Sequence, residues 1–316
     1  MPEASAPRFG SFILTFNRPT QLRETIRALI AQTVPPELVV VIDNGDNEET
    51  TSVIREFGDA RLEYCATGEN LGSAGGVAFG MRLLLDRGCE WIHSVDDDDP
   101  PLTPDTVERL RALIERNDDG RLGVVAAVGS RWDWTTGEQR RLRDDELTGD
   151  VPVDIVGGGQ QLTVCRRVLE EIGTPDPEFF FGHYDPIWCL LVAKAGYRLM
   201  VDGELMYRNR EIANRVGVTV HRAKLPRQPY DAIWRRYYVT RNYVYAMRQM
   251  FDRPDLARRE TAKSLVRTVA SWGHGPRYGA RFSLLQLRGV VDGYRGRLGR
   301  TVIPWADPKQ PSTPRR

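Results

Sequence analysis

The sequence has little that would place it in or across a membrane. It contains no uninterrupted apolar run near the ~18 residues that a spanning helix requires. Residues 1–7 also lack the apolar centre of a secretion signal. We therefore expect neither a transmembrane segment nor export, and we predict a cytoplasmic protein.

Cysteine is scarce as well. The chain has four cysteines, and no two of them form a CxxC pair. They are Cys65, Cys89, Cys165 and Cys189. This spacing argues against a zinc cluster and a disulfide framework, and it favours reduced thiols in the cytoplasm.

Two glycine-rich nucleotide motifs are missing. The first strand-like segment is followed by Thr-Phe-Asn-Arg-Pro-Thr, where a dinucleotide-binding fold would have GxGxxG. No GxxxxGKS/T phosphate loop occurs, and no RRM or KH motif is present. These absences exclude the common dinucleotide-dependent enzymes and P-loop NTPases, and we expect no nucleic-acid partner.

What the sequence does have is a regular alternation of strand-like and helix-like segments. Strand patterns occur at 9–16, 38–42, 61–65, 90–95 and 122–128, and helical patterns at 20–30, 48–57, 72–87 and 107–115. This alternation predicts an α/β fold with a mostly parallel sheet and helices on both faces. A chain of 316 residues can form one such domain with an appendage.

The most unusual stretch is a run of four aspartates, Asp96–Asp99, between strand 90–95 and Pro100. Neighbouring carboxylates repel by roughly 0.7 kcal/mol at about 6 Å in bulk water, and several-fold more in a cleft of low effective dielectric. Mg²⁺ or Mn²⁺ would compensate this repulsion. The alternative is a solvated acidic loop before the helix that starts near Thr103.

Polar residues gather at the predicted carboxyl ends of four strands. The four sets are Thr15, Asn17 and Arg18; Asp43 and Asn44; Asn70 and Gly72; and Asp96 to Asp99. Ligands of parallel α/β sheets bind at this edge, so the four sets predict a site for a nucleotide with a metal. The glycines at 72, 75 and 76 favour either close approach of a ligand or tight helix packing.

The middle of the chain carries further candidates. Residues 131–150 are polar and predict an excursion or lid over the sheet. A strand at 153–156 leads into Gly157, Gly158 and Gly159, which indicate close approach to a ligand or to a neighbouring strand.

Asp185 and His221 carry two open interpretations. Asp185 precedes a helix predicted at 187–195, so it is either a functional acid or a helix cap. His221 follows a strand-like stretch, 216–220, and is either a metal ligand or a structural histidine.

Charge is divided unevenly along the chain. Residues 222–316 hold 21 Lys and Arg against 6 Asp and Glu, which leaves 23 against 37 for residues 1–221. Segments 230–248 and 281–291 predict basic helices that mix arginine with apolar residues. Interfacial helices have this pattern, and so do helices that pack on a sheet with their arginines outward. The charge split favours a basic face for a membrane surface or a phosphate, and attraction between the two parts of the chain is the alternative.

Taken in order, these residues resemble the inverting glycosyltransferases of family 2, which have the GT-A fold, a Rossmann-like fold for nucleotide-diphospho-sugars. The branch with rhamnosyl- and galactofuranosyltransferases is the most similar. The resemblance spans about residues 9–248. It rests on Thr15 to Arg18, Val40 to Asn44, Asn70 to Gly76, Trp91 to Pro101, Phe179 to Asp185 and Arg236 to Asn242. It implies a GT-A domain at 1–225, a basic helical region at 226–300 and a flexible tail at 301–316.

The resemblance also implies roles for individual residues. Asp185 would be the catalytic base, and Asp96 and Asp98 the metal ligands, with His221 completing the site; Asp97 and Asp99 are the alternative pair. Thr15, Asn17, Arg18, Asp43, Asn44, Asn70, Gly72 and Asp97 would hold the donor nucleotide. Gly157, Gly158, Gly159, Gln160, Tyr184 and Trp188 would line the donor sugar or the acceptor.

The family pattern around the base is not fully kept. Tyr184 stands where the family has an aspartate, and Ile187 stands where it has a second acid. The resemblance implies a UDP- or dTDP-sugar donor, Mn²⁺ or Mg²⁺, and a glycan, polyprenyl-linked sugar or small molecule as acceptor. A catalytically silent nucleotide-sugar-binding protein and a sugar-phosphate nucleotidyltransferase are the alternatives.

Overall fold

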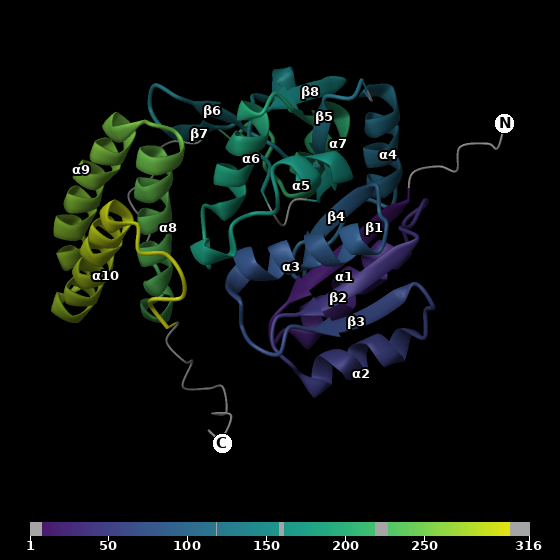
Figure 1. The fold of residues 1–316 in the computed structure, drawn as a ribbon, viewed down its shortest axis with the longest axis horizontal. Helices are drawn as coiled ribbons and strands as arrows, with labels where there is room; N and C mark the ends of the chain where they lie inside the picture. Colours follow the sequence, from purple (N-terminus) through teal and green to yellow (C-terminus); the bar gives the residue numbers. More distant parts are fainter. Residues whose placement is uncertain (1–7, 118, 158–160, 219–226, 304–316) are drawn as a thin grey trace. The chain divides into compact units, whose positions relative to one another are not determined.

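The computed structural model describes residues 8–117, 119–157, 161–218 and 227–303 (Figure 1). The chain divides into two compact units, and each is described by itself. Unit 1 comprises Met1–Pro177 and Asp185–Thr219, and unit 2 comprises Glu178–Tyr184 and Val220–Arg316. Seven residues from the middle of the chain therefore fold with its C-terminal part.

Unit 1 is built on an eight-stranded sheet with the strand order β3-β2-β1-β4-β9-β5-β10-β8. The strands are β1 (Phe9–Thr15), β2 (Leu38–Asp43), β3 (Leu62–Ala66), β4 (Trp91–Asp96), β5 (Leu122–Ala126), β8 (Asp150–Val153), β9 (Leu162–Cys165) and β10 (Arg198–Asp202). Only β9 and β8 run antiparallel to their neighbours. The sheet is therefore mostly parallel, as predicted.

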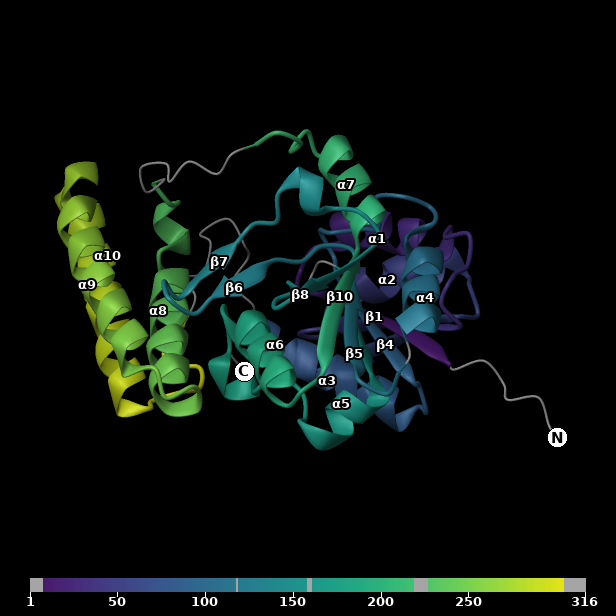
Figure 2. The same ribbon diagram turned by 90° about the horizontal axis from the view of Figure 1, so that it is seen from above.

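Helices cover both faces of this sheet. They are α1 (Pro19–Ile30), α2 (Glu48–Phe57), α3 (Gly72–Asp86), α4 (Thr106–Asn117), α5 (Arg166–Glu171), α6 (Tyr184–Lys194) and α7 (Gly203–Ile212). Figure 2 shows α1, α2 and α4 on one side of the strands, with α3, α5 and α6 on the other. Strands β1 and β2 are buried along their whole length, as expected for parallel strands covered on both faces.

Glycines let α3 lie close against β1. A Cβ atom on Gly76 would come within 2.5 Å of Leu14, and one on Gly80 within 2.6 Å of Phe12. Gly72 begins the helix with φ +74°, a left-handed conformation that L side chains rarely adopt. Tight packing therefore accounts for Gly76, whereas Gly72 is required by the backbone turn.

Several sequence expectations were wrong in the middle of the chain. Strand β9 was not predicted, because four residues after a glycine run give little local signal. Strand β8 ends at Val153, where the sequence predicted a strand to begin. The polar stretch 131–150 contains a small hairpin, β6 (Arg131–Asp133) and β7 (Glu138–Arg140), and the start of β8. Residues 216–218 form a turn rather than a strand.

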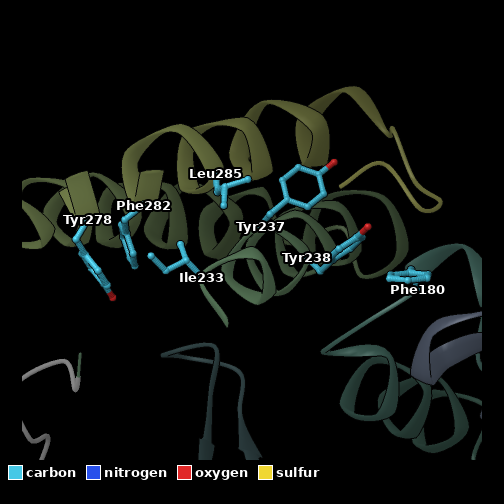
Figure 3. Packing of buried hydrophobic residues seen from close by; sticks show 7 residues of the cluster. All are labelled: Phe180, Ile233, Tyr237, Tyr238, Tyr278, Phe282 and Leu285. Atoms are coloured by element: carbon cyan, nitrogen blue, oxygen red, sulfur yellow. The ribbon is translucent and has the colours of Figure 1, made fainter. Parts of the chain in front are cut away.

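Unit 2 is mainly helical. Its elements are α8 (Trp234–Tyr245), a π-helical turn (Ala246–Met250), α9 (Pro254–Ser271) and α10 (Pro276–Arg295). Helix α8 is a packed helix, one of the two interpretations that its mixture of aromatics and arginines left open. Tyr237 and Tyr238 are fully buried and pack with Phe180, Phe282 and other residues into the unit's core (Figure 3).

Two polar residues of α8 hold the segment Glu178–Tyr184. The fully buried Arg241 donates to the carbonyls of Phe179 and Gly299, at 2.8 and 2.7 Å. Asn242 donates to the carbonyls of Phe181 and Gly182, at 2.9 and 2.7 Å. Phe180 and His183 both have φ +59°, so these hydrogen bonds hold a strained backbone.

No helix among the described residues is long and apolar enough to cross a membrane. The predicted tail, 301–316, lies outside the described residues except for 301–303.

Replacing Gly289 by Ala should lower the free energy of unfolding by roughly 1–3 kcal/mol, because overpacking forces neighbouring backbones apart. A Cβ atom at Gly289 would lie 2.6 Å from the backbone oxygen of Tyr237, at the contact between α10 and α8. Chemical denaturation measures the change. Gly273→Ala is the matched control, since no atom lies within 4 Å of its Cβ position. Equal effects of the two substitutions would contradict this account of the packing.

Candidate active site

The carboxyl ends of three neighbouring strands bring the predicted polar sets together. Strand β1 pairs in parallel with both β2 and β4. The register places Thr15 beside Asp43 and Leu14 beside Asp96. Residues that are 82 positions apart in the sequence, such as Thr15 and Asp97, therefore come into direct contact.

Asp97 is the buried anchor of the aspartate run. The Thr15 hydroxyl donates to Oδ2 of Asp97 at 2.7 Å, and the Arg18 guanidinium donates to Oδ1 at 3.1 Å. Thr25 of α1 donates to the backbone carbonyl of Asp97 at 2.7 Å. Both carboxylate oxygens already have protein donors, so Asp97 is poorly suited to bind a metal.

Arg18 supplies the positive charge nearest to the run. Its guanidinium also donates to Asp98 at 2.6 Å. Burial alone would lower the pKa of Arg18, but Asp97 and Asp98 raise it above its ordinary value. One arginine thus offsets part of the repulsion among four carboxylates.

Asp96 and Asp99 remain electrostatically strained. Burial, and then repulsion from the neighbouring aspartates, raises the pKa of Asp96 to about 7. Burial and Asp98 raise the pKa of Asp99 to about 6, while Arg215 acts in the opposite sense. Within the described residues neither side chain has a hydrogen-bond donor, which leaves both available to a cation.

A chain of buried polar residues supports the end of the run. The Ser11 hydroxyl lies 2.9 Å from Nδ1 of His93, and the other ring nitrogen lies 2.9 Å from Oε1 of Gln161. Gln161 in turn donates to the carbonyl of Asp99 at 2.8 Å. Burial lowers the pKa of His93 to about 4, so this histidine is neutral and structural.

Asp43 presents an acceptor without a donor. The backbone N–H of Asn47 and the Tyr64 hydroxyl donate to Oδ2, at 2.8 and 3.1 Å. Oδ1 is buried and has no hydrogen-bond partner among the described residues. A buried acceptor without a donor is costly, and a bound ligand with a hydrogen-bond donor would remove that cost.

The asparagines of the site mainly shape its loops. Asn44 accepts from the Leu71 N–H at 2.9 Å and donates to the Gly72 carbonyl at 3.0 Å. Asn70 accepts from the Gly72 N–H at 2.8 Å. Asn17 has φ +55° and accepts from the side chain of Asn47 at 3.2 Å. Asn44 and Asn70 thereby fix the loop that enters α3.

Asp185 lies in the first turn of α6, which begins at Tyr184, three residues before the predicted start of that helix. It is half-buried, and its charge contributes to the raised pKa of Asp96, so it lies within electrostatic range of the aspartate run. It lies inside the helix, where an acid in the first turn also suits the helix dipole, so both interpretations of Asp185 stay predictions.

The neighbours of Asp185 are buried. Tyr184 is 7% exposed and Trp188 is 2% exposed. The indole N–H of Trp188 donates to the carbonyl of Gly173 at 2.9 Å. The contact that the structure records for Trp188 is therefore a hydrogen bond to the backbone of the loop before α6.

Some predicted site residues are not described. Gly158, Gly159, Gln160 and His221 lie outside the described residues, and Gly157 is the last described residue before that gap. Within the described ranges, no three His, Cys, Asp or Glu side chains are arranged as a metal-binding group. Magnesium and manganese sites often use only one or two carboxylates with substrate phosphates, so Asp96 and its neighbours fit such an ion.

Three supporting residues were missed by sequence reasoning. Thr25 is a buried polar residue on the apolar face of α1, and that position was a usable signal. Gln161 and Arg215 had no such signal, because their partners, Asp99 and His93, lie far away in the sequence.

Comparison with known proteins identifies the family. The model of the family "Glycosyl transferase family 2" matches residues 12–172, about half of the chain. The chain belongs to glycosyl transferase family 2. The matched part contains β1 to β9 and the aspartate run, so the polar edge described above is the site of a family 2 domain.

Curated relatives come from mycobacteria. The chain is 35% identical over 188 residues to the galactofuranosyltransferase GlfT1 of Mycobacterium tuberculosis. It is 25% identical over 181 residues to GlfT1 of Mycolicibacterium smegmatis. Each match covers 53% of this chain and 59% of the relative's length.

Solved structures agree on the GT-A fold. The mannosyltransferase PcManGT from Pyrobaculum calidifontis, in complex with GDP-Man and Mn²⁺, gives a TM-score of 0.53 at 17% identity, over 92% of this chain and 88% of that one. GalNAc-T7 with UDP, GalNAc and Mn²⁺ gives 0.53 at 13% identity, over 78% and 48%.

Replacing Asp96 by Asn should stabilise the metal-free protein, and increasingly so as the pH rises. Unfolded aspartate titrates near about 3.9, whereas folded Asp96 has a pKa of about 7. Between these values the unfolded state is the more ionised, so the folded wild type loses stability as pH rises.

The difference in free energy of unfolding between the Asp96→Asn variant and the wild type should grow by at least about 1 kcal/mol between about pH 5 and pH 8. Chemical denaturation with a chelator present measures this margin. His93, with a pKa of about 4, contributes in the opposite sense but is common to both proteins. Exposed Asp86→Asn is the control. A margin that stays constant or shrinks would refute the buried, repelling cluster.

Proposed function

We propose that this chain is a metal-dependent inverting glycosyltransferase that moves a sugar from a UDP- or dTDP-sugar to an acceptor hydroxyl. One observation carries the proposal. Asp185 lies near enough to Asp96 for its charge to help raise the pKa of Asp96, and Asp96 lies at the strand-end edge of a family 2 domain. Residues 1–225 would be the catalytic domain, with 226–300 as a helical accessory region and 301–316 as a tail.

Asp43 supports a pyrimidine donor. Its unpartnered Oδ1 needs a hydrogen-bond donor, and the N3–H of uracil or thymine is one. Thr15 and Arg18, beside it, would keep Asp97 in place along the nucleotide. Asn17, Asn44, Asn70 and Gly72 would form the surrounding wall through the loops that they shape.

Asp96 and Asp98 would hold Mn²⁺ or Mg²⁺, and His221 is the proposed third ligand. Asp96 is favoured because it is half-buried and lacks a protein donor in the described part of the chain. Asp98 accepts from Arg18 through Oδ2 alone, whereas both carboxylate oxygens of Asp97 have donors. When bound, the ion would neutralise charge on the leaving diphosphate. Both solved structures named above contain Mn²⁺, which supports a divalent cation here.

Asp185 would act as the general base. Its carboxylate would take the proton of the acceptor hydroxyl as that oxygen bonds to the anomeric carbon. The bond from that carbon to the nucleoside diphosphate breaks in the same step, so the configuration inverts. Burial, and then the charges of the neighbouring aspartates and of Asp185, disfavour loss of the proton from Asp96.

The acceptor would be a glycan, a polyprenyl-linked sugar or a small molecule, near Gly157–Gln160 and Tyr184. The mycobacterial relatives favour a galactofuranosyl or similar donor sugar. All four cysteines are free, which supports a reducing, cytoplasmic setting. The basic helices of residues 226–300 support peripheral contact with a membrane that carries the acceptor.

Asp185→Asn should lower the transfer rate by at least about 10³-fold, because the base is lost, while donor affinity stays within about threefold. Product formation from a panel of UDP- and dTDP-sugars and calorimetric donor binding measure the two effects. Asp86→Asn is the control. Unchanged transfer would remove Asp185 from the chemistry.

The same experiment separates the second candidate. Tyr184 and Ile187 depart from the family pattern, which favours a silent nucleotide-sugar-binding protein. That candidate predicts metal-dependent donor binding without transfer or donor hydrolysis in the wild type.

Asp43→Asn should weaken UDP or dTDP binding by roughly 10- to 100-fold, because a charged hydrogen bond contributes about 1.5–3 kcal/mol. Isothermal titration with each diphosphate measures this. Asp46→Asn is the matched control. Asp46 is an exposed acid in the same loop, and because exposed charges contribute little, this change should alter affinity less than twofold. Equal losses in the two variants would exclude the assigned role of Asp43.

A further inference from the structure

Helices α9 and α10 form an antiparallel hairpin within unit 2. Figures 1 and 2 both show them side by side. The indole N–H of Trp272 donates to Ser283 at 3.1 Å, and the Gln286 amide donates to Ser264 at 2.7 Å. These two contacts fix which turns of the helices lie level with each other.

The outer face of this hairpin is apolar. Leu265, Val269 and Trp272 follow one another at helical spacing along α9, and Leu284, Leu287 and Val291 do so along α10. Together with Val266 they are 39–75% exposed. Because Trp272 is level with Ser283 and Ser264 with Gln286, the two stripes run beside each other.

This concentration of apolar surface is unusual in the protein. Seven of the fifteen exposed large hydrophobic residues in the described chain lie on these two helices and the turn between them. Soluble proteins rarely leave so contiguous a patch uncovered unless it is an interaction surface.

The rim of the face is strongly basic. The exposed cations of the two helices are Arg258, Arg259, Arg277, Arg288 and Arg295. The acids of residues 254–295 are Asp255, Glu260 and Asp292, and each forms an ion pair with an arginine. The net field around the apolar face is therefore positive.

One end of the hairpin carries a basic cavity of about 440 Å³, lined by Arg227, Tyr230, His274 and Arg277 among others. The guanidinium of Arg277 lies 5.2 Å from the centre of the Tyr230 ring, and that of Arg281 lies 4.7 Å from it. These arginines also lower the pKa of Tyr230, which agrees with a positive potential there. A cavity of this kind suits a phosphate group.

Charge decides between two occupants of the face. A second copy of this chain would bring two basic rims together, and like charges across an interface disfavour association. An anionic bilayer instead has an apolar acyl region beneath a layer of negatively charged phosphates. An amphipathic surface with a basic rim matches that profile.

We propose that the outer face of the α9–α10 hairpin docks on an anionic bilayer, with the apolar stripes at the acyl boundary and the arginines at the level of the lipid phosphates. This inference rests on the peripheral membrane contact of the proposed function and assigns it to a defined surface.

Vesicle co-flotation of the full chain tests the proposal. Phosphatidylcholine vesicles with about 30 mol% phosphatidylglycerol should bind the wild type at least tenfold more tightly than pure phosphatidylcholine does. About 0.5 M salt should abolish most of the difference. Equal binding to both vesicles, or none to either, would overturn the proposal.

Two sets of variants separate the apolar and basic contributions. Leu265→Ser, Val269→Ser and Leu284→Ser combined should weaken binding to anionic vesicles about tenfold, as should Arg258→Gln, Arg259→Gln and Arg277→Gln combined. The matched control is Leu102→Ser with Ile212→Ser, two exposed residues of unit 1. A control that weakens binding equally would overturn the assignment of this face.

Two further measurements keep the result interpretable. Circular dichroism checks that each variant folds, and light scattering gives its mass. A wild-type dimer that the serine variant converts to monomer would assign the face to a second copy and overturn the membrane proposal. Donor hydrolysis is measured in parallel: loss of vesicle binding with hydrolysis intact counts against this surface alone, whereas absent hydrolysis in the wild type counts against the proposed function.

Discussion

Repulsion among the four carboxylates that follow β4 is the constraint on which the rest of the site depends. The sheet places Asp96 and Asp97 at a partly buried edge where water screens their charges poorly. Side chains from other parts of the chain donate hydrogen bonds to some of these carboxylates. Thr15 and Arg18 saturate Asp97, and Arg18 also neutralises Asp98. Burial, together with the repulsion that remains, raises the pKa values of Asp96, Asp97 and Asp99. That arrangement is the basis on which we propose a cation at this edge.

The remainder of the fold serves to hold this edge still. Glycines at 76 and 80 bring α3 against β1, and Asn44 ties the β2 end to the start of α3. The segment that leads into Asp185 is also held in place, by hydrogen bonds within unit 2. Buried Arg241 and Asn242 donate to carbonyls of this segment, in which three of the four residues 180–183 have a left-handed backbone conformation. Rigid support for a short, strained approach is what a positioned acid requires.

Local pattern predicted the first half of unit 1 well and the second half poorly. The strands at 9–16, 38–42 and 90–95 were predicted within a residue or two, because buried parallel strands are continuous apolar runs between turn residues. Strand β9 was missed, although it lies between β4 and β5, because four residues gain their strand conformation from pairing rather than from composition. The pattern of α8 left an interfacial and a packed helix both open, and the burial of its tyrosines in the core of unit 2 decides for packing.

The sequence by itself determined the fold class, the family and the strand-end position of the candidate residues, since these depend on the order of segments along the chain. Only the tertiary structure decided which partners those residues have and how deeply each is buried. It showed that Asn44 and Asn70 shape a loop and that Trp188 is buried and donates to the Gly173 carbonyl. Among the described residues, it also showed a buried oxygen of Asp43 without a donor. Hydrogen bonding and burial depend on neighbours that lie tens of residues away, and no local pattern records them.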